Sequence, residues 1–162
     1  MFCYQCEQTA QGTGCTQVGV CGKDERTSDL QDLLLYLTKG ISQYAYEAAL
    51  LGEQSSSVNH YVVESLFTTI TNVNFDSENL AGFIGKGLDI RDEAQKMYEE
   101  AAKKAGVAPK TFAGPATFVV AIEAEKIKEQ AITHGVTGRI ARMGADLSGV
   151  YEIGIYGLKG LA

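Results

Sequence analysis

Cysteine is absent from most of this sequence, because all four cysteines of the 162-residue chain lie within its first 21 positions. A disulfide framework normally spreads its cysteines over the region that it cross-links, so the clustering argues against one. Proline is scarce as well, and its two copies lie outside the long periodic stretches. Clustered cysteines in a chain without a secretion signal instead indicate a metal site.

An excess of basic residues is also absent, since 14 Lys and Arg against 20 Asp and Glu give a formal net charge of −6. Nucleic acids and anionic membranes attract clustered Lys and Arg, so neither is expected as a partner. The first cysteine follows Met1 within two residues, which excludes a signal peptide, and the apolar runs are too short to span a bilayer. With 45% apolar residues, we expect a soluble, cytoplasmic protein with a hydrophobic core.

The sequence predicts an all-α fold that follows a cysteine-rich loop. Residues 1–26 sustain no helical or alternating pattern and are punctuated by glycines such as Gly12. Residues 27–106 carry helical apolar spacing and predict a three-helix bundle. Residues 107–162 predict a linker, a helix and the first helix of an incomplete second bundle.

Capping signals locate the helices of the predicted bundle. The first helix is expected to begin at a capping box that starts with Ser28 and to end before Gly52. The second should begin near Ser57 and break over residues 72–76, and the third should begin with Ser77 as its cap. Short connections between long helices favour antiparallel neighbours.

The second half of the chain gives weaker signals. Pro115 suits the first position of a helix that runs to His134, and a last helix should begin near Asp146. The segment Ile155–Gly160 of that helix echoes Leu35–Gly40 of the first helix, which hints that a second bundle begins there. The chain then ends while still apolar, so we expect it to be the front part of a longer protein.

The four cysteines follow the pattern C-x2-C-x8-C-x5-C, formed by Cys3, Cys6, Cys15 and Cys21. Two intervening residues let Cys3 and Cys6 turn tightly around one metal, and the glycine-rich loop can bring the other two thiolates close. Four thiolates satisfy either an iron–sulfur cluster or a tetrahedral zinc ion. The unequal spacing favours an iron–sulfur cluster, because zinc ribbons typically use two matched knuckles; zinc and then disulfides are the alternatives.

Several segments together resemble the hybrid-cluster (prismane) protein family, whose members are generally described as hydroxylamine reductases. The segments that carry the resemblance are Met1–Ala10, Gly14–Thr16, Val20–Lys23, Leu30–Leu34, Phe67–Phe75 and Tyr156–Gly160. They occur in the family's order, and the likeness weakens between about residues 104 and 146. The family is also distantly related to carbon monoxide dehydrogenases.

The resemblance implies more than the spacing does. It implies a helical N-terminal domain of two bundles, with residues 1–26 as the iron–sulfur cluster-binding segment at its start. Cys3, Cys6, Cys15 and Cys21 would then be the ligands of a [4Fe-4S] cluster, as in the family class with this spacing, or of a [2Fe-2S] cluster, as in another class. The expected function is electron transfer from a redox partner protein toward a catalytic centre that reduces hydroxylamine or nitric oxide.

The resemblance also implies what this chain does not contain. The family's catalytic hybrid cluster takes His, Glu and Cys ligands from later domains, and no cysteine follows Cys21 here. His60 and His134 are expected to be structural or solvated, so we expect neither a hybrid cluster nor a catalytic residue in this chain. The missing domains, or another copy of the chain, are possible partners.

Two other functions fit the same residues. The cysteines could hold zinc and staple a helical interaction module without redox activity. They could also act without metal as a redox sensor that forms reversible disulfides. Metal content distinguishes these hypotheses from the iron–sulfur interpretation.

Overall fold

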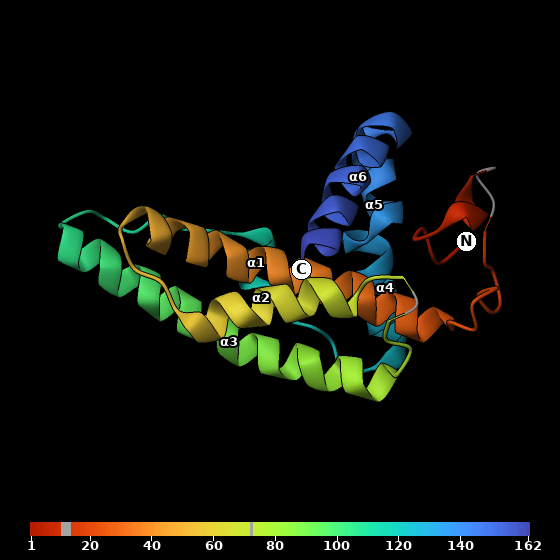
Figure 1. Ribbon diagram of the computed structural model, residues 1–162, viewed down its shortest axis with the longest axis horizontal. Helices are drawn as coiled ribbons and strands as arrows, with labels where there is room; N and C mark the ends of the chain where they lie inside the picture. Colours follow the sequence, from red (N-terminus) through yellow and green to blue (C-terminus); the bar gives the residue numbers. More distant parts are fainter. Residues whose placement is uncertain (11–13, 72) are drawn as a thin grey trace.

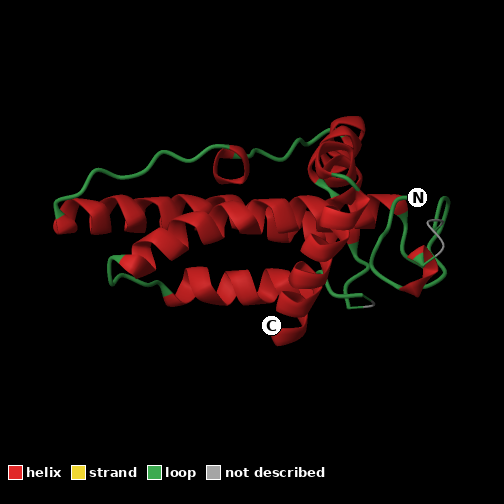
Figure 2. Cartoon of the chain, turned by 90° about the horizontal axis from the view of Figure 1, so that it is seen from above, coloured by secondary structure: helices red, strands yellow, loops and turns green. Residues whose placement is uncertain are grey.

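The structure is a computed structural model that describes residues 1–10, 14–71 and 73–162 (Figure 1). Its helices are α1 (Glu25–Leu50), α2 (Ser56–Thr68), α3 (Ser77–Ala105), α4 (Ala124–His134), α5 (Val136–Met143) and α6 (Ala145–Leu161), with short 3₁₀ helices η1 (Glu7–Thr9) and η2 (Gly114–Thr117). The described ranges contain no β-strand, which confirms the all-α prediction (Figure 2). Gly12, in the predicted irregular segment, and Asn72, the first residue of the predicted helix break, lie outside the described residues.

Helices α1, α2 and α3 lie side by side and run in alternating directions (Figure 1). Their apolar faces meet in a common core that includes Leu33 and Leu37 of α1, Tyr61 of α2, and Leu80 and Ile84 of α3. Burying one large apolar side chain contributes roughly 1.5–3 kcal/mol relative to leaving it exposed. The helical spacing seen in the sequence therefore corresponds to one shared interior. None of the described helices is both long and apolar enough to cross a membrane.

Two glycines allow the backbone to approach closely at this core. A Cβ atom at Gly87 of α3 would lie 2.2 Å from the hydroxyl of Tyr61 and 2.7 Å from Cδ2 of Leu37. A Cβ atom at Gly40 of α1 would lie 2.1 Å from the carbonyl oxygen of Pro115 in η2. A hydrogen atom in place of a side chain is therefore what lets α3 and η2 lie against α1 at these points.

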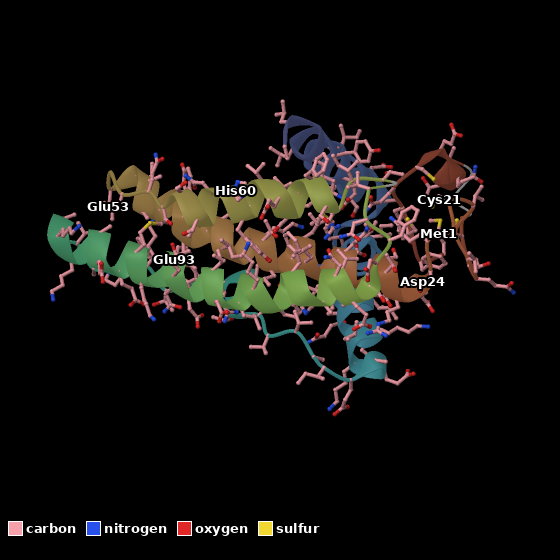
Figure 3. The ribbon with its side chains drawn as sticks, turned by 60° about the horizontal axis from the view of Figure 1, so that its bottom comes forward. Met1, Cys21, Asp24, Glu53, His60 and Glu93 are labelled. Carbon is pink, nitrogen blue, oxygen red and sulfur yellow. The ribbon has the colours of Figure 1, made fainter. Side chains whose placement is uncertain are left out.

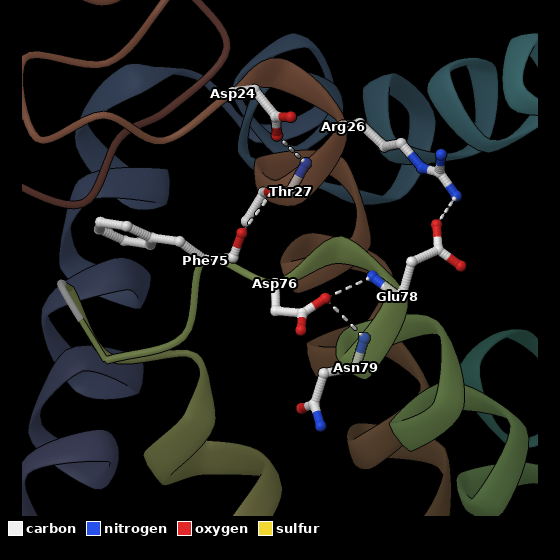
Figure 4. A network of polar contacts seen from close by, with 7 residues as sticks. All are labelled: Asp24, Arg26, Thr27, Phe75, Asp76, Glu78 and Asn79. Carbon is white, nitrogen blue, oxygen red and sulfur yellow. Dashed lines mark hydrogen bonds and ion pairs between the residues drawn. The ribbon is translucent and has the colours of Figure 1, made fainter.

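The N-cap of helix α1 lies four residues before the predicted cap. The side chain of Asp24 accepts a hydrogen bond from the backbone N–H of Thr27 at 2.7 Å, so Asp24 is the N-cap (Figure 4). The prediction of Ser28 as the cap was wrong, because the Ser28 hydroxyl instead donates to the carbonyl oxygen of Phe2 at 3.0 Å. Gly52 follows the C-terminus of α1 with a φ of +85°, as expected of a helix-ending glycine.

The start of α3 lies beside the start of α1. Asp76, rather than the predicted Ser77, caps α3 by accepting from the backbone N–H groups of Glu78 and Asn79 (Figure 4). Arg26 donates to Glu78 at 2.9 Å, so the two first turns are also joined by an ion pair. Helix α2 likewise begins slightly early, with Ser55 as its cap. All of these caps are short acceptors that satisfy free helix N–H groups.

The predicted helix from Pro115 to His134 was wrong in its first half. Pro115 belongs to η2, which ends at Thr117, and the backbone is extended at Phe118 before α4 begins. The ring of Phe118 is buried and meets Tyr36 of α1 edge to face, with centroids 5.0 Å apart. The side-chain amide of Gln130 in α4 binds this extended segment through Val119 and Ala121. The weak pattern that follows also forms a helix, α5.

Candidate metal centre

The cysteine-rich segment lies at the end of the molecule where α1 begins (Figure 3). The carbonyl oxygen of Phe2 accepts from the Ser28 hydroxyl of α1, and that of Gln5 accepts from Thr71 after α2 at 2.8 Å. These bonds hold the backbone on both sides of Cys3 against the helices. The segment is thus attached to the helical body at the backbone of Phe2 and Gln5.

Within the segment, backbone hydrogen bonds replace regular secondary structure. The N–H of Phe2 donates to the carbonyl oxygen of Cys15 at 3.0 Å, which places the residues next to Cys3 beside Cys15. The N–H of Gly19 donates to the carbonyl oxygen of Lys23 at 2.7 Å, and the N–H of Gly22 donates to the carbonyl oxygen of Gly19 at 2.8 Å. The φ of +92° at Gly22 favours glycine there.

The four predicted ligands fit a cluster in their chemistry. All four cysteines are free thiols; Cys3 and Cys15 are half-buried, and Cys6 and Cys21 are exposed. A Cβ atom at Gly19 would lie 3.3 Å from the sulfur of Cys21, so bare backbone lies beside that thiol. Peptide N–H groups near cluster sulfurs are one of the ways in which proteins stabilise iron–sulfur centres.

The arrangement of the thiols does not itself form a metal site. Across the ranges that the structure describes, no three or more side chains of His, Cys, Asp or Glu lie together as a set that could hold a metal ion. The structure thus brings Cys3, Cys6, Cys15 and Cys21 into one segment but not around one point. Their assignment as ligands stays a prediction.

Two lysines at this end of the molecule are buried, Lys23 within the segment and Lys159 on α6, which the sequence did not indicate. Lys23 is 1% exposed and donates to the side-chain oxygen of Gln31 at 2.8 Å, and Lys159 is 3% exposed and donates to the carbonyl oxygen of Thr69 at 2.9 Å. Burial lowers the pKa of Lys159 to about 8, whereas nearby acidic groups oppose that shift. Nothing in the sequence around Lys159 distinguished it from an exposed lysine, because its burial comes from tertiary contacts.

A small cavity lies between the cysteine-rich segment and helices α1, α5 and α6. Its volume is about 40 Å³, and its lining includes Phe2, Asp32, Glu152 and Lys159. Burial raises the pKa of Asp32 to about 6, and the Arg139 guanidinium opposes that rise. The Glu152 carboxylate of this lining accepts a hydrogen bond from Arg139 and is therefore already paired with a cation.

The two histidines lie away from the cysteines in the sequence and serve structural contacts. His60 is exposed on α2 and lies 3.2 Å from Glu64, one helical turn on. His134 ends α4, where its ring stacks on Tyr36 at 4.2 Å and meets Phe118 edge to face. Burial, and then the Arg142 charge, lower the pKa of His134, so its charged form is disfavoured.

Comparison with known proteins identifies the family. The model of the Prismane/CO dehydrogenase family matches residues 1–159, which is nearly the whole chain. The chain therefore belongs to the Prismane/CO dehydrogenase family, and the resemblance seen in the sequence is confirmed.

The similar curated proteins bear the name hydroxylamine reductase. The one from Geobacter sulfurreducens is 44% identical over 164 residues, that from Geobacter metallireducens 43% over 164, and that from Rhodospirillum rubrum 39% over 162. Each match covers 100% of this chain and 30% of the relative. The chain thus spans about 30% of the length of these relatives and is homologous to their N-terminal part.

Proposed function

We propose that this chain is the iron–sulfur electron-transfer domain at the N-terminus of a hybrid-cluster protein. The observation that carries the proposal is the group of four free thiols in one loop at the start of a chain of this family. Two exposed and two half-buried cysteines place the thiols near the surface, where an external donor can reach them. The buried ammonium groups of Lys23 and Lys159 at this end of the molecule also suit a negatively charged group near them.

In this proposal Cys3, Cys6, Cys15 and Cys21 hold a [4Fe-4S] cluster. Such a cluster supplies one-electron chemistry, with a potential set by net charge, hydrogen bonds and solvent exposure. The loop must close further around the iron than it does in the present arrangement, and its glycines give the backbone the freedom to do so. Metal binding of this kind supplies folding energy to a segment that has little packing of its own.

The complete protein would reduce hydroxylamine or nitric oxide at a second centre held by later domains. No cysteine follows Cys21, so this chain does not supply a thiolate to that centre. Its role would be to take electrons from a redox partner protein and pass them inward, to the missing domains or to another copy of the chain. Helices α4–α6 would begin the second bundle of the domain.

Metal analysis tests the proposal. The chain is purified without oxygen, with iron supplied during expression, and its visible absorption, iron, zinc and sulfide contents are measured. The proposal expects a brown protein with about four iron and four sulfide per chain. A colourless protein with one zinc would contradict it and indicate a structural module. A metal-free protein whose cysteines form reversible disulfides would indicate a redox sensor.

A further inference from the structure

Lys159 reaches from the last turn of α6 into the turn between the first two cysteines. Its ammonium donates to the carbonyl oxygen of Thr69 at 2.9 Å. When the side-chain amide of Gln5 is oriented to donate to that same carbonyl oxygen at 2.8 Å, the Gln5 oxygen accepts from Lys159 at 3.3 Å. Gln5 lies between Cys3 and Cys6, so Lys159 is hydrogen-bonded within the C-x2-C turn itself.

The charge of Lys159 is not neutralised by a direct partner. Its hydrogen-bond acceptors are a carbonyl oxygen and an amide oxygen, and no ion pair formed by the described residues includes it. Glu152, the nearest candidate on α6, is paired with Arg139. Lys23, the second buried lysine of this region, is also held by an amide oxygen, that of Gln31. Burying a charge without a direct partner is costly. The carboxylates of Asp32 and Glu152 act on Lys159 without bonding to it, and an anion on the Cys3–Cys6 turn would compensate its charge further.

We propose that the ammonium of Lys159 raises the reduction potential of the cluster. It does so by compensating the negative charge of the thiolates on the Cys3–Cys6 turn. This inference rests on the proposed function. Reduction adds one electron, taken from an external donor, and makes the centre more negative by one charge. A fixed cation beneath the turn stabilises that added charge, and burial strengthens the effect by excluding water.

The test uses the full chain reconstituted without oxygen with iron and sulfide. Lys159→Met removes the charge but retains an unbranched side chain, and Lys159→Arg retains the charge. Lys39→Met is the control, because Lys39 is a half-buried lysine whose ammonium lies over the ring of Tyr151 instead of within the Cys3–Cys6 turn. The reduction potential of each protein is measured by titration with dithionite, followed by the EPR signal of the reduced cluster.

We expect Lys159→Met to shift the potential to a more negative value, with Lys159→Arg and Lys39→Met close to the unmodified chain. Equal potentials in all four proteins would overturn the inference but leave the cluster itself established. A wild-type chain that assembles no cluster would instead overturn the proposed function.

If a variant loses the cluster, its helical content and the behaviour of the arginine variant distinguish a role of the charge from a role in packing. If Lys159→Met keeps its far-UV helical signal but loses the cluster, and Lys159→Arg retains it, the positive charge is required and the inference is supported. If Met and Arg lose the cluster equally, Lys159 acts through packing and the inference fails.

Discussion

Asp29 is half-buried in the second turn of α1, between the carboxylates of Glu25 and Asp32. Burial, and then the charge of Glu25, raise the pKa of Asp29 to about 7. An unfolded Asp titrates near about 3.9, so the folded chain binds a proton more readily than the unfolded one. The stabilising contribution of the proton is complete below the unfolded pKa and is lost as pH rises to about 7.

Replacing this carboxyl by an amide should remove that pH dependence. We expect Asp29→Asn to be more stable than the unmodified chain at pH 8 and nearly equal to it at pH 4, because the amide is never ionised. Urea denaturation at the two pH values measures the difference. Asp89→Asn, at an exposed position on α3, is the control and should follow the unmodified chain. A stability difference between Asp29→Asn and the unmodified chain that is the same at both pH values would contradict the raised pKa of Asp29.

The packing of α3 against α1 and α2 depends on Gly87. A methyl group there would collide with Tyr61 and Leu37 in the core, so Gly87→Ala should destabilise the chain by about 1–3 kcal/mol. Gly85, two residues earlier, has no atom within 4 Å of its Cβ position. Gly85→Ala should therefore stabilise the helix by up to about 1 kcal/mol. Thermal and urea denaturation of the two variants compare the two effects, and equal behaviour would refute the close approach at Gly87.

Element boundaries could be predicted only where one local signal dominated. The glycine after α1 was recognised because a positive φ leaves few alternatives. The capping box at Ser28 was misleading, because its expected partner Gln31 instead binds Lys23 and the carbonyl oxygen of Asn74. Asp24 could have been recognised as an equally good cap, but which acceptor turns toward the helix depends on contacts with the cysteine-rich segment.

The helix predicted from Pro115 failed for a tertiary reason. Proline at the first position was a correct signal for a turn, which the structure realises as the short helix η2. Phe118 then gains more by burying its ring against Tyr36 than by continuing the turn, and this requires an extended backbone. The sequence shows that Phe118 and Tyr36 are present, but it does not show that the fold brings their rings together.

The sequence predicts ligands for the candidate site, which stay a prediction, but it does not predict the surroundings of those ligands. Clustering and spacing single out the four cysteines without any coordinates. Lys159, by contrast, lies far from Cys3 in the chain and reaches Gln5 only because α6 packs beside the end of α2. Interactions of this kind follow from topology, which local patterns do not specify.

Taken as a whole, the molecule combines a cysteine-rich segment with little regular secondary structure and a well-packed set of helices. The core of α1–α3 is apolar and contains no cysteine, so the helices should not require the cluster. We expect Cys15→Ala to lose or convert the cluster while the far-UV helical signal remains nearly unchanged. The matched control is Thr16→Ala at the exposed neighbouring position, which should keep the cluster. Global unfolding of the Cys15→Ala chain would contradict the independence of the helices.

The proposed function also predicts which reaction the isolated chain cannot carry out. With four thiolates engaged by one cluster and no cysteine beyond Cys21, the isolated chain should show no hydroxylamine turnover with a chemical reductant. Reduction of its cluster by the same reductant should still be visible as bleaching. Measurable turnover by the metal-loaded chain would show that catalysis does not need the remainder of the relatives' length.

The attachment of the cysteine-rich segment has a consequence for biosynthesis. Gln5 precedes Thr71 and Lys159 in the chain, yet it binds both of them. At about 5–20 residues per second of translation, the interval between Gln5 and Lys159 is roughly 8–30 s. During that time the contact between Lys159 and Gln5 is missing, although the hydrogen bonds of the segment to Ser28 and Thr71 can already form.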